Sequence, residues 1–210
     1  MTATALLVHG GLWEAMDAAR FWGTTGIHQG LTSYGVEVVA PDRPQYPSGW
    51  DVEVEALGEQ LAKHAGPVTI VGASNGCTVA VLLASRFPEL VDRLLLAWPA
   101  TGDDEVANER ARAGLVSRGC PPEAAESLLA GGILRGVTDL ELASLARIRV
   151  AVLPSVPENP SHQRKTVDAL LRSIRGSREL AGCPEPPTPA FRNSPQYLDQ
   201  LVRTIVEFVN

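Results

Sequence analysis

A serine between two glycines is the feature of this sequence best suited to covalent chemistry. Gly72-Ala73-Ser74-Asn75-Gly76 stands between two apolar runs. A strand that turns abruptly into a helix at such a motif presents the serine Oγ to a ligand, and the glycines let strand and helix approach closely. The turn also leaves the N–H of Asn75 at a helix N-terminus, where negative charge is favoured. The pattern indicates a nucleophilic Ser74, and the alternative is a tight turn with a serine N-cap.

A second glycine motif would supply a further hydrogen-bond donor. His9-Gly10-Gly11-Leu12-Trp13 follows the first apolar run. If this segment lies beside Ser74, the backbone N–H of Gly11 or Leu12 would point above the serine. Together with the N–H of Asn75 it would form an oxyanion hole, which stabilises the charge that develops on a carbonyl oxygen under attack.

The elements that must position these residues alternate between strand and helix. Short apolar runs typical of strands, each followed by a turn signal and a helical pattern, occur at 3–9, 36–42, 68–74, 93–99 and 149–155. This alternation predicts a mostly parallel sheet of about five or six strands. Because the runs are continuously apolar, helices should cover both faces, which gives a three-layer α/β sandwich. Ligands bind beyond the carboxyl ends of the strands in such sheets.

The whole chain, residues 1–210, is expected to form one domain. Residues 101–148 interrupt the alternation with helical patterns near 103–117, 121–131 and 138–147. This segment is longer than a minimal crossover needs, so we expect a small helical cap over the strand ends. Residues 194–209 carry apolar side chains at helical spacing and predict an amphipathic terminal helix.

Charge and cysteine content narrow the classes of function. Eighteen basic and twenty-four acidic residues give a formal charge of −6 without long charged blocks, which argues against a nucleic-acid partner. No stretch is long and apolar enough for a membrane span or a signal peptide, so we expect a cytoplasmic protein. Three scattered cysteines give no disulfide framework and no zinc motif. We expect a small-molecule substrate and neither metal nor cofactor, while the oligomeric state is left open.

With these motifs the chain resembles the α/β-hydrolase superfamily, in which an HG motif ends one strand and G-x-S-x-G ends the strand beside it. The resemblance covers nearly the whole chain and implies Ser74 as nucleophile, with Asn75 and Gly11 or Leu12 as oxyanion donors. The first strand would correspond to the third strand of the family, which implies a reduced sheet. Family members take the catalytic acid from the loop after the penultimate strand and the histidine from the loop after the last strand.

The chain departs from that pattern in its histidines. Glu158 follows the run at 149–155, where the family has its acid, but no histidine occurs after His162. Asn159-Pro160-Ser161-His162 predicts a helix start, with His162 in the first turn. The positive helix end would lower the histidine pKa and keep the ring neutral, as a base requires. We therefore expect His162 to be the base for Ser74 and Glu158 to orient it, across a gap of about 10 Å, or two strand spacings.

Other side chains are further candidates for the site. His9 is expected to support the glycine turn and His64 to end a helix. His28 is expected on a helix surface, and a role facing the pocket stays open. Asp103 or Asp104 would supply an alternative acid or base, or line the cap entrance. Aromatic residues near strand ends suit an apolar or aromatic ligand, namely Trp13, Trp22, Tyr46, Trp50 and Trp98.

Three functions follow from these residues. The first is serine-dependent hydrolysis of a small ester, thioester or lactone with an atypical triad. The second uses the same fold without an acyl-enzyme, as a cyclase, lyase or isomerase whose oxyanion hole polarises a carbonyl. The third is a ligand-binding protein without turnover. The oxyanion motifs argue against a ligand-binding protein without turnover, and the missing histidine argues against ordinary serine hydrolysis. We therefore expect an enzyme, and we favour hydrolysis narrowly over the reactions without an acyl-enzyme.

Overall fold

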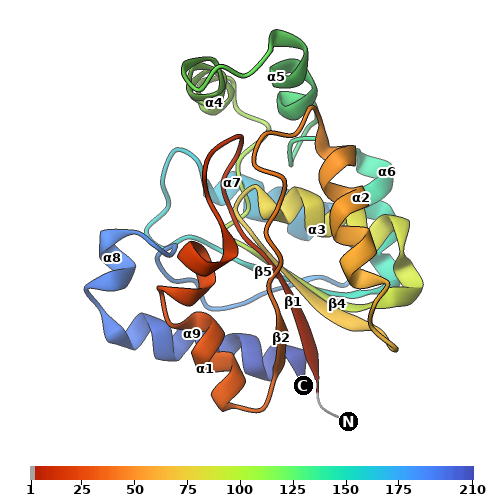
Figure 1. Ribbon diagram of the computed structural model, residues 1–210, viewed down its shortest axis with the longest axis vertical. Coiled ribbons are helices and arrows are strands. Elements are labelled where there is room, and N and C mark those ends of the chain that lie inside the picture. The colour runs from red at the N-terminus through yellow and green to blue at the C-terminus, as the bar shows by residue number, and fades with distance from the viewer. Residues whose placement is uncertain (1–2) are drawn as a thin grey trace.

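The computed structural model describes residues 3–210, which form a central parallel sheet between two layers of helices (Figure 1). Six strands are hydrogen-bonded in the order β2-β1-β3-β4-β5-β6. Their bounds are β1 Thr4–Val8, β2 Glu37–Val39, β3 Val68–Ala73, β4 Val91–Ala97, β5 Arg149–Leu153 and β6 Arg178–Glu179. The predicted three-layer α/β sandwich is confirmed.

Helices follow most of the strands, as the alternation in the sequence predicts. The α-helices are α1 Ile27–Ser33, α2 Trp50–Leu61, α3 Gly76–Arg86, α4 Glu105–Ser117, α5 Pro122–Leu129, α6 Asp139–Ser144, α7 Arg164–Ser173, α8 Pro189–Arg192 and α9 Pro195–Val209. Short turns of other helix types are η1 Ala19–Gly23, η2 Pro88–Leu90 and η3 Leu145–Arg147. None of the helices within residues 3–210 is long and apolar enough to cross a membrane.

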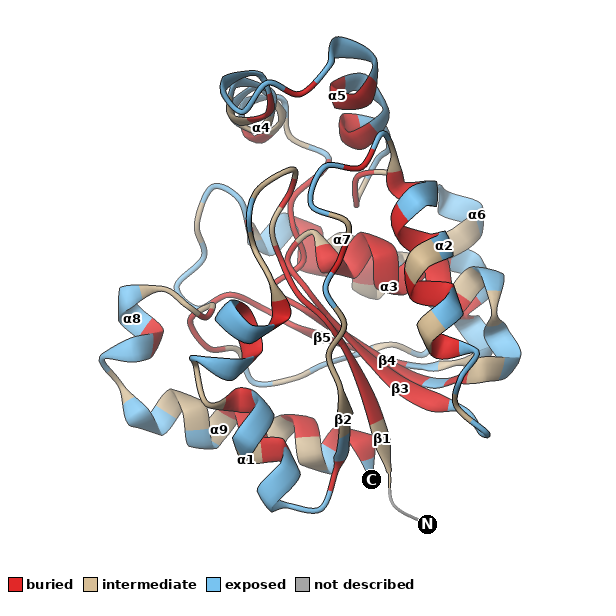
Figure 2. Cartoon of the chain, in the orientation of Figure 1, coloured by how far each residue is buried: buried red, intermediate tan, exposed pale blue. Residues whose placement is uncertain are grey.

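The four central strands β1, β3, β4 and β5 are buried between the helix layers, which explains their continuously apolar sequences (Figure 2). Every residue of β3 is buried. Ile70 belongs to a core cluster with side chains from α2, α3 and α7, whereas Val71 belongs to a cluster with side chains from α1 and α9. Successive strand residues thus point to opposite helix layers. Burial on both sides fixes the sheet as a rigid base for the loops at its carboxyl edge.

The segment expected to form a cap divides into two parts. Helices α4 and α5 lie beyond the carboxyl ends of the strands (Figure 1), and buried side chains of both, Leu115 and Leu128 among them, reach the core cluster that contains Ile70. Helix α6 packs instead against α3 and α7, and Leu142 and Leu145 enter the core cluster of that layer. Residues 139–147 therefore belong to the sandwich layers, and only the preceding part of 101–148 extends over the strand ends.

Candidate active site

Ser74 occupies a sharp turn between β3 and α3. Its φ of 53° lies in the left-handed region, which a non-glycine residue adopts at a cost. The close approach around it depends on two glycines. A Cβ on Gly76 would lie 2.5 Å from the carbonyl oxygens of Val8 and His9, and one on Gly72 would lie 2.7 Å from the Cβ of Ala80. The strained, tightly packed turn presents Ser74 at the carboxyl edge of the sheet.

His162 lies against this serine. Its Nε2 is 2.8 Å from Ser74 Oγ, and both residues are buried. The loop after β5 therefore leans inward across the edge of β4, which separates β5 from β3 in the sheet. Thr101, beyond the end of β4, holds that loop: its N–H donates to the carbonyl of Ser161 and its hydroxyl accepts from the N–H of Gln163.

The local structure around His162 differs from the predicted helix start. Helix α7 begins at Arg164, and Asn159 and His162 instead exchange backbone hydrogen bonds across a tight turn. The side-chain oxygen of Asn159 accepts from the N–H of Ser161 within that turn, so Asn159 is not the N-cap of the helix. His162 thus precedes the helix, so the helix dipole does not explain the state of its ring.

The acid beside His162 is Glu185, and the expectation for Glu158 is corrected. Glu185 Oε2 lies 3.1 Å from Nδ1 of His162, close enough for an ion pair, although the ring N–H is not aligned for a linear hydrogen bond. Glu158 is exposed, and its carboxylate accepts from the backbone N–H of Arg164 at the start of α7. The carboxylate of Glu158 therefore caps the first turn of α7 at the surface and does not reach His162.

Glu185 comes from the loop after β6, which is tied to the strand ends. Trp98, fully buried after β4, donates its indole N–H to the carbonyl of Cys183 at 2.9 Å. The N–H of Val156 donates to the same carbonyl. The Thr188 hydroxyl donates to the carbonyl of Glu185 itself. These bonds hold the proline-rich segment close to the loop that carries His162.

Burial shapes the charges of the pair. It lowers the pKa of His162 to about 4, with a smaller contribution from the nearby cation of Arg135. Burial, and secondarily the negative charge of Glu14, raises the pKa of Glu185 to about 8. Both side chains thus favour their neutral forms, and at neutral pH His162 is in the form that accepts a proton.

The glycine motif lies next to Ser74, held by buried polar contacts. A Cβ on Gly10 would lie 3.1 Å from the Cβ of Ser74. Arg43 is buried and donates to the carbonyls of His9, Gly10 and Gly11, while Glu53 accepts two hydrogen bonds from the same guanidinium.

The His9 ring stands beside the carbonyl of Gly10 and accepts from the N–H of Arg43. Burial and then the charge of Arg43 lower the pKa of His9 to about 4. His9 is thus a neutral support of the glycine turn. Gly11, with φ of 96°, turns the chain where other residues would be strained.

Leu12 and Trp13 connect the glycine motif to α4. Leu12 is buried, and its carbonyl and that of Trp13 accept from the guanidinium of Arg118 at the end of α4. The Trp13 ring packs edge-on against Tyr46 and donates to the carbonyl of Pro47. The motif is therefore fixed from both the sheet side and the helical segment above it.

Several other candidates lie away from this constellation. His28 is exposed on α1, which packs against α9, so it lies on a helix surface as expected, and the pocket-facing role that was left open for it has no support in this position. Trp22, Trp50 and Trp98 are buried in the core rather than open to a ligand. Asp104 caps α4 and pairs with Lys165. The burial of these aromatic rings depends on packing partners that their sequence positions do not reveal.

Asn75 and Arg135 complete the surroundings of the serine. Among residues 3–210, the N–H of Asn75 has no hydrogen-bond acceptor in the protein. Its side-chain oxygen accepts from Nη1 of Arg135 at 3.1 Å. Arg135 follows α5 and is 4% exposed. Arg135 and Glu185 are not among the residues expected from the sequence, because neither carries a spacing signal that distinguishes it from a surface charge.

A cavity of about 380 Å³ opens beside His162, between the loops that follow β5 and β6. Val156, Val167 and Leu180 give its wall a largely apolar surface, and the charged Glu158, Arg164 and Glu179 line it as well. Within the described part of the chain, no cluster of three or more His, Cys, Asp or Glu side chains has a geometry that could hold a metal ion.

Comparison with known proteins identifies the family of the chain. A model of the alpha/beta hydrolase family matches residues 5–206, and the chain therefore belongs to the α/β hydrolase family. A search of curated proteins gave no significant sequence match.

Solved structures share the fold at low identity. A meta-cleavage product hydrolase from Pseudomonas fluorescens is 20% identical over 98% of this chain and 90% of its own, with a TM-score of 0.68. An α/β hydrolase from a lagoon sediment metagenome is 17% identical over 99% and 91%, with a TM-score of 0.70. The thioesterase domain of the curacin biosynthetic pathway is 14% identical over 97% and 91%, with a TM-score of 0.63.

Proposed function

We propose that this protein is a serine hydrolase that cleaves a small ester, thioester or lactone through a triad of Ser74, His162 and Glu185. The observation that carries the proposal is the 2.8 Å contact between Ser74 Oγ and His162 Nε2 at a strained strand-to-helix turn. A serine becomes a useful nucleophile when a base within hydrogen-bond reach accepts its proton.

In the proposed reaction His162 Nε2 takes the proton of Ser74 while Oγ attacks the carbonyl carbon of the substrate. The N–H of Asn75 and that of Gly11 or Leu12 stabilise the oxyanion. The tetrahedral intermediate collapses as His162 gives its proton to the leaving group, which departs as an alcohol or thiol. His162 then takes a proton from water, which cleaves the acyl-enzyme and restores Ser74. Glu185 orients the ring and stabilises the imidazolium that forms.

The apolar cavity beside His162 supports an apolar part in the substrate. His162 is among the residues that line this cavity, so a group bound there lies beside the proposed base. Ligand pockets of a few hundred Å³ lined mainly by apolar side chains are typical of small-molecule sites. A small organic substrate is therefore proposed rather than a macromolecule.

Labelling by a fluorophosphonate probe tests the function, because this reagent requires an activated serine and is indifferent to the natural substrate. We expect the wild-type protein to be labelled at Ser74 and both Ser74→Ala and His162→Ala to lose labelling. The His28→Ala variant serves as the control histidine and should react like wild type. An unlabelled wild-type protein would contradict acyl-enzyme chemistry and favour a reaction that uses only the oxyanion donors.

A further inference from the structure

Arg135 is a buried cation without an acidic partner. The side chain is 4% exposed, and it donates from Nε to Asn108 and from Nη1 to Asn75, both neutral amides. No carboxylate within residues 3–210 forms an ion pair with it. Arg43 provides the contrast, because this equally buried arginine is paired twice with Glu53. Burial of an unpaired charge is costly, and it lowers the pKa of Arg135 to about 10.

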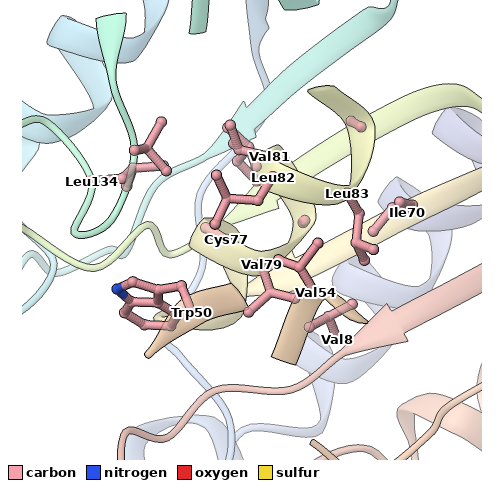
Figure 3. Close-up of a cluster of buried hydrophobic side chains, with 14 of the residues drawn as sticks. Val8, Trp50, Val54, Ile70, Cys77, Val79, Val81, Leu82, Leu83 and Leu134 are labelled. Carbon is pink, nitrogen blue, oxygen red and sulfur yellow. The ribbon is translucent and has the colours of Figure 1, made fainter. Parts of the chain in front are cut away.

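The backbone around Arg135 is held in place. Its carbonyl accepts from the Thr78 hydroxyl on α3 at 2.8 Å, and its backbone pairs with Gly131. The carbonyl of Ile133 accepts from the N–H of Gly102. Leu134 points into the core cluster that contains Cys77 and Val81 (Figure 3). The fold thus fixes the backbone that carries the unpaired guanidinium.

That position is next to the proposed nucleophile. Asn75, the residue after Ser74, accepts from Nη1, whereas Nη2 donates to no group in residues 3–210. Glu185 contacts Nδ1 of His162, on the side of the ring away from the nitrogen that faces Ser74. Glu185, the acid of the site, thus contacts the histidine and does not pair with Arg135. A guanidinium presents paired N–H donors whose geometry matches a carboxylate.

We propose that Arg135 binds a carboxylate of the substrate and that the enzyme acts on esters or thioesters that carry this second, anionic group. That the bound molecule is hydrolysed rests on the proposed function, whereas the binding of a carboxylate by Arg135 does not. A bound carboxylate would supply the counter-charge that the protein itself lacks. Arg135 is then a specificity-determining residue, whereas a role as a third oxyanion donor would affect charged and neutral substrates alike.

The test compares matched ligands that differ in one charge. These are the mono-methyl esters of succinic, glutaric and adipic acid and the corresponding methyl ester amides, so that the distance between ester and carboxylate varies. Affinities are measured by calorimetry in the Ser74→Ala background, which prevents turnover. We expect the acid of at least one chain length to bind about 10- to 100-fold more tightly than its amide, the range for a hydrogen bond to a charged group.

Adding Arg135→Gln should abolish this preference, and Arg135→Lys should keep part of it. Arg86→Gln, which removes a charge at the distant end of α3, should leave the preference unchanged. Equal binding of acid and amide at all three lengths, or a preference that survives Arg135→Gln, overturns the inference.

Two further readouts separate the inference from the proposed function. Fluorophosphonate labelling of the wild-type protein tests the activated serine without any carboxylate ligand, and far-ultraviolet circular dichroism shows whether Arg135→Gln is folded. If Ser74 is labelled but acid and amide bind equally, the anionic substrate is refuted and the proposed hydrolase is not. A charge preference without labelling of the wild-type protein supports the role of Arg135 in binding and refutes the hydrolase.

Discussion

Glu185 Oε2 lies 3.1 Å from His162 Nδ1, although the two residues come from loops after different strands. His162 follows β5, where members of the superfamily carry the acid, and Glu185 follows β6, where they carry the histidine. In the proposed triad, base and acid have thus exchanged loops while the serine keeps its place. The exchange explains why the sequence lacks a histidine at the usual position and still brings an imidazole to Ser74.

Replacement of His162 tests the base. We expect His162→Ala to lower kcat by at least about 10²-fold, the low end for loss of a general base. The exposed His28 is the matched control, and His28→Ala should retain wild-type turnover. Steady-state kinetics on an activated ester would measure both. Near-normal turnover in His162→Ala together with an inactive Ser74→Ala would mean that another group takes the proton.

Replacement of the acid distinguishes the two glutamates. Glu185→Gln removes the charge that stabilises the imidazolium, and we expect kcat to fall between about 10- and 10⁴-fold, up to the loss known for a triad Asp→Asn change. Glu158→Gln should change kcat by less than about threefold, because its carboxylate caps α7 instead. If Glu158→Gln were the more damaging variant, the assignment of Glu185 would be wrong.

The pH dependence of kcat/KM should follow Glu185. The reaction needs its carboxylate ionised, and the pKa is raised to about 8 by burial and by Glu14, so activity should increase with pH through about 8. Glu14→Gln removes a negative charge and should move this limb to lower pH. Glu59→Gln, at an exposed position of α2, is the charge control and should not move it. If the rise of kcat/KM stays at the same pH in Glu14→Gln, ionisation of Glu185 is not its origin.

Ionisation of Glu185 should also lower the stability of the protein, so the free energy of unfolding should fall over the pH range in which activity increases. Because the folded state holds the pKa of Glu185 above its ordinary value of 4.5, the protonated form is favoured in the fold, and this contribution is lost as pH rises through about 8. Glu185→Gln cannot ionise. Its free energy of unfolding should match wild type near pH 4.5 and exceed it at pH 9 by on the order of 1–3 kcal/mol. Denaturant melts at both pH values measure the difference, and a constant difference would contradict the raised pKa.

The turn around Ser74 makes a prediction about folding. A valine at Gly76 would place its Cβ 2.5 Å from the carbonyl oxygens of Val8 and His9, so Gly76→Val should destabilise the protein by at least about 1–3 kcal/mol through overpacking. Ser74→Ala removes one hydroxyl and should leave the melting temperature nearly unchanged. Equal losses in thermal melts would show that the glycine is not essential to the crossing.

The sequence was sufficient for the fold and for part of the site. Apolar runs and turn signals predict the parallel sheet because burial on both faces leaves a continuous pattern. Strand β6, with two residues, has no such pattern. The pairing of Ser74 with His162 follows from the glycine motif and the absence of any later histidine, and the structure has them 2.8 Å apart.

The remaining site residues depend on tertiary contacts. Glu185 lies in a proline-rich loop whose path is set by Trp98 and Val156, residues distant in sequence. Arg135 is buried because the loop after α5 packs on α3. Neither contact has a local signature. The helix predicted to begin at Asn159 starts later because the chain first closes a turn back on itself at His162.

The exchange of loops between His162 and Glu185 affects how members of this family are judged from sequence. A reading that requires a histidine after the last strand would count this chain among proteins that have lost catalysis. An imidazole between a hydroxyl and a carboxylate needs only the right positions in space, and two neighbouring loops can supply them in either order. Absence of a residue from its usual place is therefore informative about activity only after the adjoining loop has been searched for its substitute.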